Sequence, residues 1–306
     1  MIMLRRVLWS LALLVALAFS IVLIADQVGL QQVRGIRAKD GDTIVVEFPD
    51  GGRDEVRYAS INAPEFKNSD CFSEEAQQYN EQLIKGEDLW LELDPTDDGY
   101  RRAQGRLLAH VFLSPERTQT SSVEVLLVAG GYARLDVIDP NDTAIRNGQD
   151  FDVRYADWIT TVQTEAAKTR RDWWGECDDY VDSEVIITVI KQWSDDEIVY
   201  IVNRGSESID LAAGWKLKDA SGSERNTLDF SDYLIGECLL PPGGLLRVHS
   251  GSVATGRGGE HTACGKPEID FYWTGHPIWD QDEDEARLYR PDGSLAHYYY
   301  YPLDWD

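Results

Sequence analysis

Three clusters in the first half of the chain carry side chains suited to metal and anion chemistry. They are Asp40-Gly41-Asp42-Thr43, Arg57 with Asn62-Ala63-Pro64-Glu65, and Gly105-Arg106. A hard cation such as calcium takes oxygen ligands, and a guanidinium offers forked donors to phosphate oxygens. Each cluster alone also fits a turn, a solvated strand arginine or a helix start, so their combination has to carry the interpretation.

In their order along the chain the clusters resemble the thermonuclease (staphylococcal-nuclease-like) family. The resemblance runs from about Val33 to Glu176 and includes an arginine eight residues before the glutamate of a Pro-Glu pair. It also includes the stretch Gly130–Arg134 and the terminal Trp-Gly-Glu. It implies an α+β five-stranded barrel of the OB type and calcium-dependent hydrolysis of phosphodiester bonds in DNA or RNA.

The resemblance also implies a role for each matching residue. The implied Ca2+ ligands are Asp42, the backbone carbonyl of Thr43, and Asn62; the implied phosphate-gripping residues are Arg57 and Arg106; and the implied general base for the attacking water is Glu65. Loss of either arginine or of the glutamate is therefore expected to lower turnover far more than stability.

Position 62 departs from the family pattern, which usually has a second metal-binding aspartate there. Asn62 still offers an amide oxygen, but the site loses one negative charge. Because ligand charge tunes calcium affinity, we expect weaker calcium binding. A different metal preference, or an inactive domain that only binds, stays open.

Two further arginines are candidates for contact with the substrate. Arg102 lies in the polar run Tyr100–Gln104, and Arg134 follows the Gly-Gly turn. A solvated loop accounts for Arg102 equally well, so these two assignments rest on position alone.

The elements that must position these residues follow from hydrophobic periodicity. Alternation and turn signals predict strands, and a 3.6-residue period predicts helices. The expected strands are Val33–Phe48 with an internal turn, Glu55–Ile61, Asp88–Leu93 and Leu107–Phe112, and the expected helices are Ser73–Ile84, Val123–Gly130 and Val153–Lys168. Strands with embedded helices fit a small OB-type barrel.

From Val185 onward short strands recur with Gly and Pro turns, which is typical of a β-sandwich. This segment resembles a lamin-tail domain, an immunoglobulin-like fold, in stretches such as Ile198–Glu207, Leu211–Asp219 and Leu240–Gly244. The fold alone names no activity, and its partner stays unknown. The predicted organisation is 1–32 for a membrane or signal segment with its linker, 33–177 for the nuclease-like domain, 178–184 for an acidic linker, and 185–306 for the sandwich.

The N-terminus carries an uncharged apolar run, Val7–Ala25, after Arg5 and Arg6. About 20 such residues span a bilayer as a helix, and the preceding arginines favour a cytoplasmic N-terminus. We expect an uncleaved transmembrane anchor, with a cleaved signal peptide as the alternative. In either case the rest of the chain is expected outside the cytoplasm.

Four widely spaced cysteines suit two disulfides in an oxidising compartment. The simplest pairing keeps each bridge within one domain, Cys71–Cys177 and Cys238–Cys264. Sequence alone permits two other connectivities, or four unpaired buried thiols.

The composition is very acidic, with 54 Asp and Glu against 29 Lys and Arg and a formal net charge of −25. Surface self-repulsion of this size is screened in about 1 M salt, which favours a halophilic source over an ordinary acidic protein. This negative charge should repel nucleic acid, which is also a polyanion, at long range. Binding of nucleic acid would therefore depend on a few close contacts. A surface module that binds without turnover is the alternative to the nuclease, and a structural envelope protein is a third interpretation.

Overall fold

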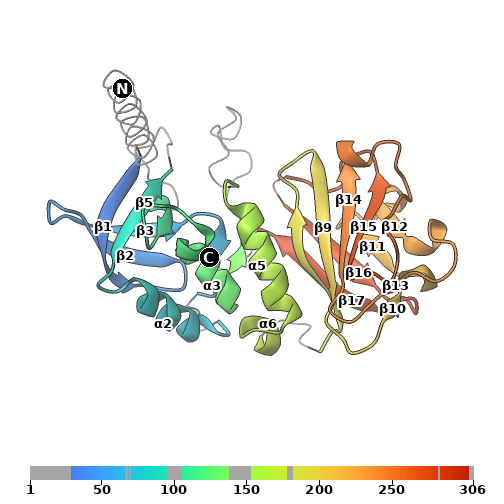
Figure 1. Cartoon of the computed structure of the whole chain (residues 1–306), viewed down its shortest axis with the longest axis horizontal. Helices are drawn as coiled ribbons and strands as arrows, with labels where there is room; N and C mark the ends of the chain where they lie inside the picture. The colour runs from blue at the N-terminus through green and yellow to red at the C-terminus, as the bar shows by residue number, and fades with distance from the viewer. Residues whose placement is uncertain are drawn as a thin grey trace, which may run out of the picture.

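The computed structural model describes residues 29–65, 68, 70–94, 105–137, 153–177, 182–281 and 283–302. Two domains lie side by side along its long axis, a barrel with helices and a sandwich of strands (Figure 1). Within the described ranges no helix is both long enough and apolar enough to cross a membrane. The run Val7–Ala25, predicted to be an anchor or a signal segment, lies outside these ranges.

The first domain is a closed five-stranded barrel in the order β1-β2-β3-β6-β5, as the predicted OB-type fold requires. All neighbouring strands are antiparallel except β3 and β6, which run parallel. Alternate side chains such as Ile44, Val46 and Val56 are fully buried inside, because successive residues of a strand face opposite sides. The strands are β1 (Leu30–Ala38), β2 (Thr43–Glu47), β3 (Arg53–Tyr58), β5 (Asp88–Leu93) and β6 (Leu107–Phe112).

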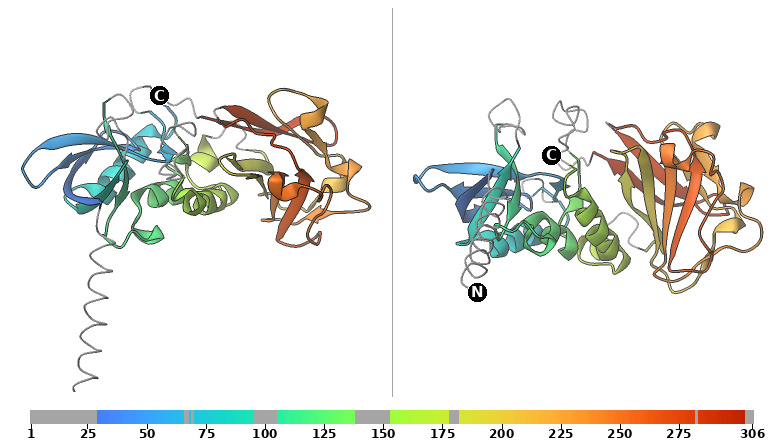
Figure 2. Two further views of the ribbon diagram at one scale, coloured as in Figure 1. Left: turned by 90° about the horizontal axis from the view of Figure 1, so that it is seen from above. Right: turned by 45° about the horizontal axis from the view of Figure 1, so that its top comes forward.

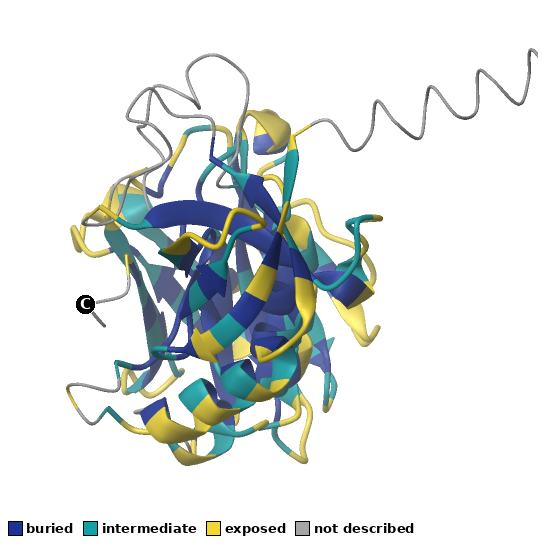
Figure 3. Cartoon of the chain, turned by 90° about the vertical axis from the view of Figure 1, so that its left-hand side faces the viewer, coloured by how far each residue is buried: buried dark blue, intermediate teal, exposed yellow. Residues whose placement is uncertain are grey.

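Helices cover the barrel, and exposed residues gather on their outward faces and on the loops (Figure 3). They are α2 (Ser73–Ile84), η2 (Gln119–Ser121), α3 (Val123–Gly130), α5 (Ala156–Lys168) and α6 (Trp173–Glu176). The predicted bounds of α2 and α3 are confirmed. The predicted third helix is shorter at its start, because residues 153–155 form a turn before α5.

A separate two-stranded ribbon lies beside the barrel. It pairs β4 (Ile61–Asn62) with β7 (Arg134–Leu135), and Ile61 is opposite Leu135. The ribbon is not part of the barrel sheet, but Ile61 and Leu135 are buried in the barrel core, so the positions of β4 and β7 are linked.

The second domain is all-β, as predicted, with two four-stranded sheets in the orders β12-β11-β16-β17 and β15-β14-β9-β8. A small ribbon pairs β10 with β13. The strands are β8 (Val185–Lys191), β9 (Asp196–Asn203), β10 (Ile209–Asp210), β11 (Lys216–Lys218), β12 (Thr227–Asp229), β13 (Leu239–Leu240), β14 (Leu245–Gly251), β15 (Glu268–Thr274), β16 (Asp284–Tyr289) and β17 (Leu295–Tyr301). Short 3-10 turns are η3 (Leu211–Ala213), η4 (Glu224–Asn226), η5 (Phe230–Asp232) and η6 (Ser252–Ala254).

The two domains share a packed interface, which α5 and α6 form on the barrel side (Figure 2). Ala166, Ala167 and Trp174 are buried in the hydrophobic cluster of the second domain. In return, Val189 of β8 is buried in the cluster of the barrel. The acidic segment 178–184, predicted to be a linker, is described only from residue 182 onward, and apolar packing joins the domains on either side of it.

Each domain contains one disulfide, and the pairing is the simplest one that the sequence allows. Cys71 bonds Cys177 with a Cα–Cα distance of 5.8 Å, and Cys238 bonds Cys264 at 4.9 Å. Their sequence separations are 106 and 26 residues. The first bridge ties the start of α2 to the end of α6 and so closes nearly the whole first domain.

Loss of the longer bridge should cost more stability than loss of the shorter one. A cross-link restricts the unfolded chain by an amount that grows with loop length, giving about 5 kcal/mol for the long loop and about 3.5 kcal/mol for the short one. Urea unfolding of Cys71→Ala/Cys177→Ala and Cys238→Ala/Cys264→Ala measures both losses. A larger loss for the second pair would contradict this prediction.

Candidate functional site

The Asp-Gly-Asp turn between β1 and β2 packs tightly against two neighbouring segments. A Cβ atom on Gly41 would lie 2.5 Å from the Ala63 Cβ and 2.9 Å from the Ala76 Cβ. Real Cβ atoms do not approach so closely, so only glycine lets the turn meet both the segment after β4 and helix α2. This contact brings the first two sequence clusters together.

Two amide side chains of α2 donate hydrogen bonds to the backbone of the Asp-Gly-Asp turn. Asn80 Nδ2 donates to the Asp40 carbonyl at 3.0 Å, and the Tyr58 hydroxyl donates to Asn80 Oδ1 at 2.7 Å. Gln77 Nε2 donates to the Lys39 carbonyl at 3.0 Å. Sequence reasoning missed these positioning residues. The signal was the pair of amides at i and i+3 on a helix that otherwise needs an apolar buried face.

Asp42 is the most deeply buried acid of the site, with a relative exposure of 2%. Its Oδ1 lies 3.2 Å from Arg57 Nε and accepts the Thr43 hydroxyl at 3.0 Å, and its Oδ2 accepts the Ala63 N–H at 2.8 Å. Burial raises the pKa of Asp42 to about 7; Arg57 opposes the rise, and the neighbouring Asp40 adds to it. The carboxylate is thus held in place but only partly compensated in charge.

Arg57 is buried as well, and most of its donors bond groups of the connection from β3 to β4. Its Nη1 donates to the Tyr58 carbonyl at 3.0 Å and to the Ile61 carbonyl at 2.6 Å, and its Nη2 donates to Asn62 Oδ1 at 3.0 Å. With Nε directed to Asp42, one Nη2 hydrogen is left without an acceptor among the described residues. The fork expected from the sequence is therefore reduced to at most one donor for a phosphate.

Arg106 reaches the same cluster from the start of β6. Its Nη1 donates to the Thr43 hydroxyl at 3.2 Å, and that hydroxyl in turn donates to Asp42. The Thr43 carbonyl, expected to bind metal, instead accepts the Lys39 N–H at 2.8 Å within the turn. Thr43 therefore joins the cluster through its hydroxyl, and the role of its carbonyl as a metal ligand stays a prediction.

Glu65 lies on the segment that leaves β4, two residues after the amide that holds Asp42. Its N–H donates to Asp70 Oδ2 at 3.0 Å, and its carbonyl accepts the N–H groups of Asn68 and Asp70 at 3.2 and 3.3 Å. These bonds close a small loop around the half-buried Glu65. Asp70, which the sequence did not single out, fixes this backbone.

The two tentative substrate contacts do not join the cluster. Arg102 lies outside the described residues, as does the whole run 95–104. The guanidinium of Arg134 lies 4.8, 5.1 and 4.5 Å from the ring centroids of Trp173, Trp174 and Tyr299. It is buried at the interface between the domains, where cation–π attraction to the three rings offsets part of the cost of burying its charge.

The donor set suits a hard cation. Asp40 and Asp42 supply carboxylate oxygens, and Asn62 supplies an amide oxygen. Burial raises the pKa of Asp42, and the neighbouring Asp40 adds to the rise; a divalent ion at the carboxylate would oppose both effects. Asp40, not predicted as a ligand, adds the acid that position 62 lacks.

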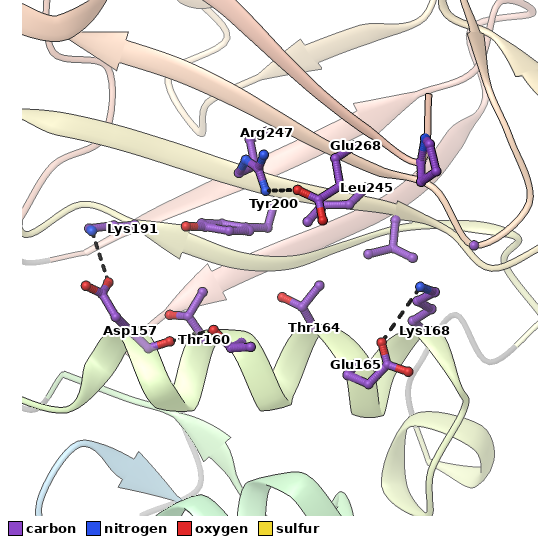
Figure 4. Close-up of a pocket in the computed structure, with 14 residues that line it drawn as sticks. Asp157, Thr160, Thr164, Glu165, Lys168, Lys191, Tyr200, Leu245, Arg247 and Glu268 are labelled. Carbon is purple, nitrogen blue, oxygen red and sulfur yellow. Dashed lines mark hydrogen bonds and ion pairs between the residues drawn. The ribbon is translucent and has the colours of Figure 1, made fainter. Parts of the chain in front are cut away.

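A hollow of about 610 Å³ lies away from this cluster, between α5 and the sheet face of β9 and β14 (Figure 4). Its three cations each face a carboxylate. The pairs are Lys191–Asp157 at 3.1 Å, Lys168–Glu165 at 3.7 Å and Arg247–Glu268 at 2.9 Å. Because its positive charges are balanced, the groove resembles a domain interface more than an anion site.

Cys238, His261 and Cys264 place their ligand atoms within 4.8 Å of one another in the second domain. Both sulfurs form the disulfide, so neither is a thiolate that could bind a metal.

The acidic run between Asp280 and Glu285 is solvated in part. Asp284 accepts backbone N–H groups there, and burial raises its pKa.

Comparison with known families agrees with this architecture. Residues 55–176 match the family described as staphylococcal nuclease homologue, and residues 180–302 match the Lamin Tail Domain. The chain therefore contains an SNase-like domain followed by a lamin tail domain, and the resemblance inferred from the motifs is confirmed at this level. No curated protein matches the chain.

The pKa of Asp42 predicts how metal affinity depends on pH. Its folded, metal-free pKa is raised from 3.8 to about 7, so the ionised form costs the metal-free protein stability as the pH rises through this range. A cation binds the ionised form and must displace the proton below pH 7. Calcium affinity should therefore rise about tenfold per pH unit up to about 7 and then level off.

Calorimetric calcium titration between about pH 5.5 and about pH 8.5 measures this dependence. Asp42→Asn is the control, and it should abolish the pH dependence together with most of the binding. Equal affinity of the parent protein at both ends of the range would contradict the prediction.

Proposed function

We propose that this protein is a calcium-dependent nuclease that hydrolyses phosphodiester bonds of DNA, RNA or both. The observation that carries the proposal is the buried Asp42–Arg57–Asn62 cluster with Arg106 tied to it through Thr43. Two arginines and an under-compensated acid in an SNase-like domain are suited to a metal ion and one phosphate. These residues come from three segments of the sequence, 40–43, 57–65 and 105–106, which the fold brings together.

In this proposal Asp40, Asp42 and Asn62 hold the ion. When bound, Ca2+ polarises a phosphoryl oxygen and offsets developing negative charge. Arg106 and the remaining Nη2 hydrogen of Arg57 stabilise the charge that builds on the phosphoryl oxygens.

Glu65 takes a proton from the attacking water. The water oxygen forms a bond to phosphorus while the bond to the leaving ester oxygen breaks; that oxygen keeps the bonding electron pair and takes up a proton from solvent. The base thus acts on a water molecule, and the arginines act on the phosphate.

The acidity of the chain constrains where such an enzyme can work. With a net charge of −25, long-range repulsion of a polyanion weakens only when salt shortens the Debye length, to about 3 Å in 1 M salt. We therefore propose a halophilic setting and activity assays in molar salt. Substrate affinity would then depend on contacts inside the site, because counterion release also contributes less at high salt.

We also propose that the enzyme works outside the cytoplasm. The two disulfides support an oxidising compartment, and the apolar run Val7–Ala25 would hold the protein on the membrane or, if cleaved, lead to its secretion.

A second candidate function is a surface module that binds nucleic acid without cleaving it. It is favoured by Asn62, whose amide oxygen is directed to Arg57 where a second metal-binding carboxylate would add charge. Calcium-dependent degradation of plain DNA or RNA separates the two functions.

Glu65→Gln should reduce cleavage while leaving the fold intact. Loss of a general base lowers turnover about 100-fold to 10,000-fold, and Glu65 is half-buried and lies outside the hydrophobic core. Cleavage of plasmid DNA and of RNA, with calcium and with chelator in molar salt, measures the effect. Glu75→Gln, at an exposed acid on α2, is the matched control. Equal activity of the two variants would contradict the role of Glu65 as general base.

Asn62→Asp should tighten calcium binding. The change is nearly isosteric, restores a negative charge at a buried site and faces Arg57, so affinity should rise on the order of tenfold because ligand charge tunes it. The calcium concentration for half-maximal cleavage measures this, with Asn68→Asp at an exposed position as control. If the two variants behave alike, residue 62 does not face the metal.

A further inference from the structure

Gln163 of α5 joins both domains through one fully buried amide. Its Oε1 accepts the Leu135 N–H of β7 at 2.6 Å, and its Nε2 donates to the Thr188 carbonyl of β8 at 2.6 Å. The same Nε2 donates to the hydroxyl of Tyr299 on β17 at 3.2 Å. A single side chain thus fixes β7 of the barrel domain against two strands of the lamin tail domain.

A second link to β7 lies one residue earlier. The guanidinium of Arg134 packs 4.5 Å from the centroid of Tyr299 and about as close to Trp173 and Trp174. Trp174 itself is buried in the core cluster of the lamin tail domain. Its carbonyl accepts Arg204 Nη1 from that domain at 3.0 Å. Tyr299 therefore contacts Arg134, which belongs to β7, and Gln163, which accepts a hydrogen bond from β7.

The ribbon transmits this placement to the candidate active site. In the β4–β7 pairing Asn62 lies opposite Arg134, and the Asp136 N–H donates to the Ser60 carbonyl at 3.0 Å. The other side of β4 offers the Ile61 carbonyl and the Asn62 amide oxygen to Arg57.

Arg57 in turn pairs with Asp42 at 3.2 Å. Direct contacts therefore run without a gap from Tyr299 in one domain to Asp42 in the other. β4 has only two residues and lies outside the barrel sheet. Its Ile61, and Leu135 of β7, pack into the barrel core, so the ribbon joins that core to the contacts that Tyr299 makes.

We infer that Tyr299 of the lamin tail domain is a positioning residue for the SNase-like site. By holding Arg134 and Gln163 it fixes β7, and through β4 it sets the arrangement of Asn62, Arg57 and Asp42. The lamin tail domain is then part of the catalytic scaffold and not only a binding appendage. The catalytic consequence rests on the proposed function, whereas the structural coupling can be measured without it.

Hydrogen exchange of the full chain tests the coupling directly. In Tyr299→Leu the amides of residues 59–65 and 132–137 should exchange about tenfold faster than in the parent protein, because the ribbon opens more often. Tyr301→Leu is the matched control. It removes the same type of buried side chain from the same strand and core cluster, but its hydroxyl bonds the Asp280 carbonyl within the lamin tail domain.

Tyr299→Phe separates the two links and provides a milder variant should the leucine variant fail to fold. It keeps the ring over Arg134 and removes only the hydroxyl that meets Gln163, so its exchange should lie between those of the parent and the leucine variant. Parent-like exchange of both segments in the folded Tyr299 variants would overturn the inference.

Kinetics supply the second readout. Tyr299→Leu should lower kcat about tenfold and raise the calcium concentration for half-maximal activity, with little change in KM because Tyr299 is buried and is not placed at the substrate. Tyr301→Leu should retain parent values. If Tyr299→Leu and Tyr301→Leu lose the same activity, general destabilisation is the cause and the positioning role is wrong.

The two proposals fail in different ways. A parent protein that shows no calcium-dependent cleavage ends the proposed function, and the exchange data still decide the coupling. A parent protein that cleaves, with parent-like exchange and kinetics in folded Tyr299 variants, ends the positioning role alone.

Discussion

The structure of the SNase-like domain depends on keeping one carboxylate, Asp42, buried and in place. Removing such a charge from water is costly unless it is paired and hydrogen-bonded. Arg57, the Thr43 hydroxyl and the Ala63 amide provide those bonds, yet burial still raises the pKa of Asp42 to about 7. A cation beside the ionised carboxylate would offset part of the cost of its burial, and the proposed metal site depends on this charge balance.

Arg57 shows how a residue can serve structure and chemistry together. Three of its donors close the β3–β4 connection and one meets Asp42. The guanidinium therefore fixes the geometry of the whole cluster and has little capacity left for a phosphate. Arg106 is half-buried and bonded to the Thr43 hydroxyl, which makes it the better placed of the two to meet a substrate. Pairs this deeply buried are screened little by salt, which suits a chain of such surface charge.

The lamin tail domain packs directly against the SNase-like domain. Its core includes Trp174 of the preceding domain, and Val189 of its first strand lies in the barrel cluster. Apolar burial of this kind favours one fixed arrangement over two modules on a flexible tether. The short ribbon that carries Asn62 lies within that arrangement, so the geometry of the site and the docking of the second domain are physically linked.

The amino-acid sequence by itself determined the local elements and the order of the motifs. The bounds of α2 and α3, the barrel strands Asp88–Leu93 and Leu107–Phe112, and the two-domain division follow from periodicity, turn residues and motif spacing, which are properties of neighbouring residues. Only the tertiary structure decided where the long side chains point. Arg134 packs on three aromatic rings, and the Thr43 carbonyl closes a turn. Asn80 bonds the turn at Asp40, and Gln163 bonds strand β7. The physical reason is that a side chain's partner is set by what packing brings within a few ångströms of it, from residues up to 136 positions away.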